Sequence, residues 1–394
     1  MIERVEKSNK IYPIYYGLSS DLVFWIAINT LFLSTVKNLS AFQINSLTTI
    51  STILAIVLYF FASKIINKIG NITSVRLANL LLLLSSLLLT FSKSYFFLLL
   101  GQILYEFAFV FKAIDSVILI KNLKYLKKEE KYLEIKNKGT TIYSLITMII
   151  SLISGFLFNI NPYLPMFICV FICIINLILS MFIVEADIKE EPNMKTSVKI
   201  SKLVVYIILI YSLLYGTVVI GQNNAKLFMQ YRLNEVVSIE KTAIILSFIV
   251  FASRLVRLIS NLTFMKIYNV LKNKIIILME FLLLVSYVLF VIGNFIRNGI
   301  IAALIMAIGF IIFLWLRDPI ENLLTELLMK NSKVDERERT IIYFQFFRKL
   351  ITFLLSMIAT LILLKFEMVY IYGLFTIIVF MYIPLIINFY KLLK

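Results

Sequence analysis

The sequence predicts an all-α integral membrane protein with twelve transmembrane helices in two pseudo-symmetric six-helix bundles. The first observation is its composition: 61% of the 394 residues are hydrophobic and only 15% are charged, with a mean hydropathy of +0.95. A water-soluble protein of this size could not cover so much apolar side chain with its own surface. The other two observations are the regular spacing of long apolar runs and a weak internal repeat.

Each apolar run is long enough to cross the hydrocarbon core of a bilayer, which takes about twenty residues of helix. The spans that we expect are 13–36, 42–63, 75–92, 95–120, 140–159, 163–184, 203–228, 242–265, 275–294, 298–325, 342–364 and 368–390. The polar residues 1–10 lead into the first run without the short apolar stretch and cleavage site of a signal peptide. We therefore expect no removable signal peptide.

The net charge of +17 is explained by membrane topology and does not indicate nucleic-acid binding. With the N-terminus placed in the cytoplasm, most of the 39 Lys and Arg residues fall in cytoplasmic segments and few in outer ones. This distribution follows the positive-inside rule. We therefore expect a multi-pass protein of the cell membrane, surrounded by lipid, monomeric, and with both termini cytoplasmic.

Two stretches of sequence recur at nearly the same offset, about half the chain length. Residues 63–71 (SKIINKIGN) resemble residues 265–273 (MKIYNVLKN), and residues 144–151 (SLITMIIS) resemble residues 349–356 (KLITFLLS). Ile, Leu, Lys and Asn are so common here that each match is weak alone. Together they indicate two homologous halves, as in many repeat-built membrane proteins.

A charged, proline-containing stretch separates the halves at residues 185–202 (EADIKEEPNMKTSVKISK). Such a stretch is typical of a linker. The sequence therefore predicts an N-terminal six-helix bundle over 1–184, a cytoplasmic linker over 185–202 and a C-terminal six-helix bundle over 203–394.

Twelve spans, cytoplasmic termini, a linker after the sixth span and a short basic loop after the second resemble the major facilitator superfamily. In that family the short loop carries a motif of the form G-x-x-x-D-R-x-G-R-K, and the matching stretch here is SKIINKIGNI. Lys68 and Gly70 fit the motif, so the resemblance implies that they form the gating motif. The positions that depart from it are Ser63, Asn67, Asn71 and Ile72. Because Asn67 replaces the acid that latches the cytoplasmic side in the family, we expect a weaker latch or one made by other groups.

The resemblance implies a secondary active transporter that moves a small solute by alternating access. The sequence has no P-loop, so ATP does not drive transport directly, and we expect no cofactor. It has no histidine and no obvious nucleophile or acid pair, which counts against a membrane enzyme and a metal site. Cys169 and Cys173 lie in one apolar run and predict packing. The costly charges inside the membrane count against a non-transporting receptor of this fold, although structural ion pairs could explain them.

Two arginines lie near the middle of the expected eighth span, in SFIVFASRLVRLIS (247–260). Ionisable groups inside a membrane are costly unless they are paired or hydrated, which makes Arg254 and Arg257 functional candidates. On a helical wheel they share one narrow polar stripe with Ser247 and Asn261. The stripe predicts one wall of a solute cavity. The alternative is an ion pair with a carboxylate of a neighbouring helix, which would hold the bundle together.

The expected fourth span carries a second polar stripe, formed by Gln102, Tyr105, Glu106, Lys112 and Ser116. Glu106 lies about half-way across, and a carboxylate at such a depth is suited to reversible protonation. We therefore expect it to couple transport to protons. The alternative is a salt bridge to Lys112, Arg254 or Arg257 that keeps it ionised. Proton coupling and the salt bridge are compatible if the solute or a proton displaces the ion pair.

The expected tenth span contains FLWLRDPIENLLTELL. Arg317 corresponds to Lys112 at the repeat offset, which indicates cations at related places in the two halves. The residues Asp318 to Glu321 (DPIE) also have the pattern of a helix start, and on that interpretation the span ends near Arg317 and an amphipathic helix follows. We favour a kinked, continuous span.

Spans one, four, seven and ten line the cavity in the resembled family, which makes their polar residues candidates for the transport site. With the arginines of span eight, the expected solute-binding residues are Arg254, Arg257, Lys112, Gln102, Asn29, Asn223, Asn224 and Arg317, and the expected proton-coupling residues are Glu106 and Asp21. Deep cations outnumber deep carboxylates, which favours an anionic or zwitterionic solute.

The alternative function is a proton-coupled drug, multidrug or lipid exporter of the same fold. The fifth span lacks the Gly-Pro signature of drug/proton antiporters in the resembled family, which counts against a drug exporter. Asp115 and Glu280 lie near cytoplasmic ends of spans, where we expect them to pair with loops.

Overall fold

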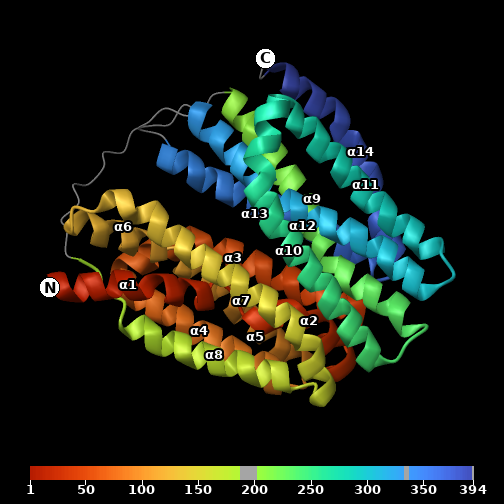
Figure 1. Ribbon diagram of the computed structural model, residues 1–394, viewed down its shortest axis with the longest axis horizontal. Coiled ribbons are helices and arrows are strands. Elements are labelled where there is room, and N and C mark those ends of the chain that lie inside the picture. The colour runs from red at the N-terminus through yellow and green to blue at the C-terminus, as the bar shows by residue number, and fades with distance from the viewer. Residues whose placement is uncertain (187–201, 332–336, 393–394) are drawn as a thin grey trace. The chain divides into compact units, whose positions relative to one another are not determined.

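The computed structural model describes residues 1–186, 202–331 and 337–392. Within these ranges the chain folds into helices joined by short turns, and no strand is present (Figure 1). In this part of the chain, eleven helical segments are long and apolar enough to cross a membrane. The predicted all-α membrane fold is confirmed. Nearly all of the expected linker, 185–202, lies outside the described residues.

The chain forms two compact units, each of them a helical bundle. Unit 1 comprises Met1–Lys37 and Ile50–Lys195, and unit 2 comprises Asn38–Thr49 and Thr196–Lys394. The segment Asn38–Thr49, which leads into the second expected span, therefore groups with the second half of the chain. Its Asn45 Nδ2 donates a hydrogen bond to Asn224 Oδ1 at 2.9 Å, within unit 2.

The helices of unit 1 cover the first half of the chain. They are α1 (Ile2–Ser19), α2 (Val23–Leu31), the π-helix η1 (Phe32–Val36), α3 (Ala41–Ile69, which starts in residues of unit 2), α4 (Asn71–Phe91), α5 (Tyr95–Lys112), α6 (Asp115–Tyr125), the 3-10 turn η2 (Glu129–Lys131), α7 (Tyr132–Ile160) and α8 (Leu164–Met181). Small buried side chains, among them Ala55 of α3 and Ala78 of α4, let these helices pack closely around Val110 of α5.

The first expected span, 13–36, differs from the structure at its start and in its middle. Its helix begins at Ile2 because polar groups near the N-terminus find partners: Asn122 Nδ2 donates to Asn9 Oδ1 at 3.3 Å. The helix then breaks between α1 and α2, where Leu22 has extended backbone angles. Asn176 Nδ2 donates to the carbonyl oxygen of Leu18 at 2.9 Å, which satisfies one backbone group that the break exposes.

The fourth expected span, 95–120, is also broken. α5 ends at Lys112 and α6 begins at Asp115, with a turn at Ala113 and Ile114 between them. The prediction of one continuous helix was wrong here. Both breaks of unit 1 thus fall beside charged residues, which is the usual place for irregular backbone inside a membrane protein.

Gly70 forms the junction between α3 and α4. Its φ of 85° and ψ of 157° lie in a region that side chains with a Cβ rarely adopt. A Cβ at this position would meet no atom within 4 Å, so the backbone conformation alone requires glycine. The backbone conformation thus explains the glycine at this position of the motif.

The helices of unit 2 cover the second half of the chain. They are α9 (Lys202–Asn234), α10 (Ile239–Leu271), the 3-10 turn η3 (Lys272–Lys274), α11 (Ile275–Phe295), α12 (Gly299–Asn331), α13 (Arg337–Ile362) and α14 (Met368–Leu392). α12 runs without interruption through Arg317 and Pro319, so the continuous tenth span is confirmed and the alternative helix start is wrong.

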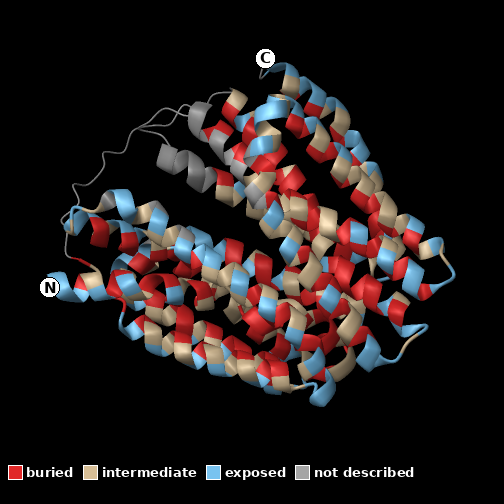
Figure 2. Ribbon diagram, in the orientation of Figure 1, coloured by how far each residue is buried: buried red, intermediate tan, exposed pale blue. Residues whose placement is uncertain are grey.

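An aromatic cluster fills the core of unit 2. Phe290 and Tyr372 stack with ring centroids 4.2 Å apart, and Tyr287 meets the ring of Phe313 edge-on at 5.0 Å. Gly221 lies against Phe313, where an added Cβ would come within 2.4 Å of the ring. Buried residues gather on the sides of the helices that face other helices (Figure 2). This packing holds the charged side chains described next in fixed positions.

Candidate functional site

The predicted proton-coupling residue Asp21 lies at the break of the first span, where it meets Tyr105 of α5. Tyr105 of α5 donates its hydroxyl to Asp21 Oδ1 at 2.6 Å. Glu106 is close enough to interact electrostatically with the same phenol. The Tyr105, Asp21 and Glu106 side chains are all half-buried. The structure thus places two carboxylates around one tyrosine, at a point where the membrane helix is interrupted.

A second polar cluster lies at the break of the fourth span. Lys112 Nζ is 3.0 Å from Asp115 Oδ2, and both side chains are buried. The Tyr15 hydroxyl lies 3.3 Å from both carboxylate oxygens of Asp115, and the Lys112 ammonium sits 4.6 Å from the centroid of the Tyr15 ring. Lys112 Nζ also donates to the Ser19 hydroxyl. Asn79 Nδ2 completes the cluster by donating to the Tyr15 hydroxyl at 3.0 Å.

This cluster corrects two expectations. Asp115 was expected to pair with a loop, but it is buried and pairs with Lys112 of the same span. Lys112 was one of the alternative salt-bridge partners expected for Glu106, but it pairs with Asp115. The sequence signal was available, because Lys112 and Asp115 are three residues apart and therefore adjacent on a helical surface.

In unit 2 the Arg257 guanidinium forms a bidentate ion pair with Asp318 of α12. Arg257 Nε and Nη2 each donate to one carboxylate oxygen at 2.7 Å. The side chains are 23% and 15% exposed, so the pair is mostly buried. Ser260, one turn further along α10, donates to the carbonyl oxygen of Trp315 at 2.9 Å. For Arg257 the structure has the arrangement named above as the alternative, a pair with a neighbouring helix.

Glu321, part of the helix-start pattern that was the alternative for the tenth span, pairs with Arg348 of α13. Arg348 is not among the residues that the sequence predicted for the site. Arg348 Nη1 of α13 lies 3.2 Å from Glu321 Oε1 and donates to the Tyr211 hydroxyl at 3.2 Å. Its guanidinium also lies 5.0 Å from the centroid of the Tyr215 ring. The DPIE stretch of α12 therefore supplies two carboxylates that join α12 to α10 and to α13.

The other predicted solute-binding residues differ in exposure. Arg254, Arg317 and Asn29 are half-buried, Gln102 and Asn224 are buried, and Asn223 is exposed. Asn224 Nδ2 donates to the carbonyl oxygen of Ile220 at 3.0 Å, one turn back along α9. Arg254 lies one helical turn before Arg257, so the guanidinium groups project from neighbouring parts of the α10 surface.

A polar network lies next to the predicted gating motif in unit 1. Lys68 is exposed. The residue after Gly70, Asn71, donates its Nδ2 to Glu185 Oε1 at 2.5 Å, and Lys121 Nζ lies 3.1 Å from the same oxygen. Asn71 and Glu185 lie 114 residues apart in the sequence. The family motif includes this loop, but it does not predict Glu185 as a partner of the loop.

Among the described residues no group of three or more Cys, Asp or Glu side chains is arranged to hold a metal ion. Cys169 and Cys173 are buried free cysteines of α8.

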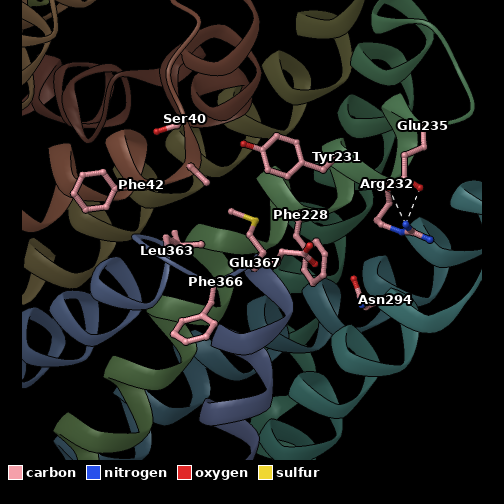
Figure 3. Close-up of a pocket in the computed structure, with 12 residues that line it drawn as sticks. Ser40, Phe42, Phe228, Tyr231, Arg232, Glu235, Asn294, Leu363, Phe366 and Glu367 are labelled. Carbon is pink, nitrogen blue, oxygen red and sulfur yellow. Dashed lines mark hydrogen bonds and ion pairs between the residues drawn. The ribbon is translucent and has the colours of Figure 1, made fainter.

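A pocket of about 430 Å³ lies at one end of unit 2 (Figure 3). Arg232 Nη1 donates to both carboxylate oxygens of Glu235 at 2.8 and 2.7 Å on its wall. Phe228 and Tyr231 also line it. None of the predicted solute-binding residues lines this pocket.

Comparisons with known proteins agree with this architecture. A model of the major facilitator superfamily matches residues 16–356. No curated protein matches the sequence significantly.

Solved structures of transporters have the same fold. The nucleoside transporter NupG has a TM-score of 0.71 at 10% identity, over 98% of this chain and 99% of that chain. A bacterial homologue of the iron transporter ferroportin in an inward-facing state has a TM-score of 0.68 at 15% identity, over 99% of both chains. A D-xylose-proton symporter has a TM-score of 0.65 at 12% identity, over 97% of both chains. These identities show the fold alone. Because the family model matches most of its length, the chain belongs to the major facilitator superfamily, whose members are membrane transporters and not enzymes.

Proposed function

We propose that this transporter couples the movement of a small anionic or zwitterionic solute to protons, and that Asp21, Tyr105 and Glu106 form its proton site. The supporting observation is the arrangement of two half-buried carboxylates around one phenol at the break between α1 and α2. The D-xylose-proton symporter among the structural neighbours is an example of proton coupling on this fold.

The chemistry of this arrangement suits a proton that comes and goes. The Tyr105 hydroxyl donates to the ionised form of Asp21. Because all three side chains are half-buried, water can deliver and remove the proton.

For the solute we propose Arg254 as the first contact. A guanidinium inside a membrane span can bind carboxylate or phosphate in bidentate fashion. Arg254 is half-buried and lies beside the Arg257–Asp318 pair on α10. Lys112 is paired with Asp115, and Arg257 is paired with Asp318. Because each cation would have to leave its carboxylate before it could bind an anionic solute, we propose that they contact the solute only after Arg254.

Transport into proteoliposomes tests the proton site. With an imposed proton gradient, wild type should accumulate the solute. Glu106→Gln and Asp21→Asn should lose this accumulation and keep exchange of labelled for unlabelled solute, because exchange needs no net proton movement. Glu240→Gln changes an exposed carboxylate of α10 and serves as the control. Gradient-driven uptake that survives in both site variants would contradict the proposal.

The solute class is tested by thermal stability of purified protein against anionic, zwitterionic and cationic compounds. A ligand at a hundred times its dissociation constant adds about 2.7 kcal/mol to the free energy of unfolding. We expect anions or zwitterions to stabilise wild type and to have no effect on a folded Arg254→Ala variant. Stabilisation of that variant by the same anions would exclude Arg254 as a contact.

A second candidate function is export of cationic drugs or lipids. It is favoured by the same two half-buried carboxylates, which can bind an organic cation in exchange for a proton. Stabilisation by cations alone, lost in Glu106→Gln, would establish this function in place of the first.

We further propose that the chain lies in the cell membrane with both termini in the cytoplasm, supported by the bias of Lys and Arg along the sequence. A reporter domain that is active only in the cytoplasm should be active when it is fused to either terminus. Loss of its activity at one terminus would place that terminus outside.

A further inference from the structure

Glu280 of α11 has a buried carboxyl group that makes no hydrogen bond and no ion pair with the described residues. The side chain is only 3% exposed, and neither carboxylate oxygen has a hydrogen-bond partner among the described residues. The expectation that Glu280 pairs with a loop was wrong. A buried carboxylic acid without donors is uncommon, because such groups are normally paired or hydrogen-bonded.

A second polar group without a partner lies nearby. α11 packs against α14 along its length (Figure 1), and Tyr382 of α14 is 9% exposed. The Tyr382 hydroxyl has no hydrogen-bond partner among the described residues either, and it is close enough to interact electrostatically with Glu280. Two unsatisfied polar groups thus face the same interface between α11 and α14.

The other charged groups around α11 have different partners or positions. α12 packs on α11, but its Asp318 pairs with Arg257 and its Glu321 with Arg348. Lys272 and Lys274 in the turn η3 before α11 are exposed. Among the described residues no Lys or Arg interacts with the Glu280 carboxyl group.

An ionised carboxylate in these surroundings would be very costly, because no described side chain donates a hydrogen bond to it or neutralises its charge. A metal ion would need several more oxygen ligands, and the described residues hold no such cluster. A proton needs only the carboxylate itself and one acceptor for its hydrogen bond. The Tyr382 oxygen can be that acceptor.

We propose that Glu280 is a proton-binding site in unit 2, with Tyr382 as its hydrogen-bond partner. It is separate from the Asp21–Glu106 site of unit 1 and does not depend on it. Because the ionised acid is tolerated only in water, proton binding at Glu280 favours tight packing of α11 on α14. Loss of the proton favours a state in which this interface admits water. Proton concentration therefore biases the packing of unit 2.

Infrared difference spectroscopy of the whole protein tests the proposal directly. The spectrum of wild type minus Glu280→Gln at neutral pH should contain the carbonyl stretch of a protonated carboxylic acid. The spectrum of wild type minus Glu240→Gln, an exposed glutamate, should contain no such band. Absence of the band in the Glu280 difference spectrum would overturn the proposal. Loss of the band when sodium replaces choline in the buffer would also overturn it, since the site would then bind a metal ion.

A second variant keeps the test valid if Glu280→Gln does not fold. Tyr382→Phe leaves Glu280 in place and removes its partner, so the carbonyl band should move without disappearing. An unmoved band would exclude Tyr382 as the partner.

Thermal unfolding adds a measurement that needs no assignment of bands. The folded-to-unfolded ratio of wild type should fall by up to about tenfold per pH unit from about pH 4.3, where an unfolded glutamate releases its proton, up to the pH at which folded Glu280 releases its own. Above that pH this contribution should stay level, because both states have then lost the proton. The ratio for Glu280→Gln should lack this part of the dependence. Equal pH profiles of the two proteins would overturn the proposal.

Discussion

The Tyr105 hydroxyl and the Asp21 carboxylate are joined by a 2.6 Å hydrogen bond although they lie 84 residues apart. A hydrogen bond to a charged group contributes about 1.5–3 kcal/mol. In Tyr105→Phe the Asp21 carboxylate loses this donor, so it should bind protons more tightly and release them at higher pH. We expect the pH profile of proton-driven uptake to shift to higher pH, with folding retained.

Tyr125→Phe, at an exposed position of α6, is the matched control for Tyr105→Phe. It removes the same hydroxyl from a place without a carboxylate partner. If both variants shifted the pH profile equally, the effect would not come from the Tyr105–Asp21 hydrogen bond.

The Arg257–Asp318 pair should stabilise unit 2 even if it also takes part in transport. Removing one partner leaves a partly buried charge, which costs up to about 3 kcal/mol at a site that water screens in part. Arg257→Ala and Asp318→Ala should each lower the apparent melting temperature. The double variant should lose less than the sum, because neither charge is then left alone. Additive losses in this double-mutant cycle would show that the two groups do not interact.

Gly70→Ala should destabilise the protein through its backbone alone. A residue with a Cβ at φ 85° and ψ 157° costs about 1–3 kcal/mol. Gly373→Ala in α14 is the control, since an added Cβ there also meets no atom within 4 Å but the backbone is helical. It should be neutral or stabilise by up to about 1 kcal/mol. Equal melting temperatures for the two variants would contradict the strained backbone at Gly70.

Lys37, just after the first span, should make stability depend on pH. Its Nζ donates to the carbonyl oxygen of Thr90 at 2.6 Å and lies 5.1 Å from the centroid of the Phe32 ring. Burial lowers the pKa of Lys37 to about 8, and the nearby Lys93 acts in the same direction. In the unfolded chain a lysine has a pKa of about 10.4. Between these two values the unfolded state binds more protons, so the free energy of unfolding should rise with pH.

Unfolding measured from about pH 8 to about pH 10 checks this prediction. Wild type should gain stability across this range, and Lys37→Met should gain less. Lys365→Met, at an exposed position, should behave like wild type. A flat profile for wild type would mean that Lys37 keeps its ordinary pKa in the folded protein.

The sequence located the membrane helices well because hydropathy is a property of each stretch by itself. The continuous course of α12 through Pro319 also followed from its own residues. The breaks at Asp21 and at Ala113 were missed, since neither carries a proline or glycine. They exist because side chains from other helices, such as Asn176, satisfy the exposed backbone.

The sequence predicted which residues belong to the candidate site better than it predicted which residues they contact. Glu106 was predicted from its depth and Asp21 from its place on the first span, and in the structure both interact with Tyr105. The partners of Lys112 and Arg257 were open questions, and Asp115 and Glu280 were expected to lie at loops. A hydropathy window shows that a charge lies in a membrane segment, but it does not show what faces that charge.

By itself the sequence determined that this chain crosses a membrane many times. It also predicted that basic residues favour one side and that the two halves are related. These properties depend on the transfer of each segment from water to lipid, which is local. Only the tertiary structure decided which charges are neutralised in pairs and which acid, Glu280, is buried without a cation. The reason is that the energy of a buried charge depends on the few ångströms around it, and those are filled by helices distant in sequence.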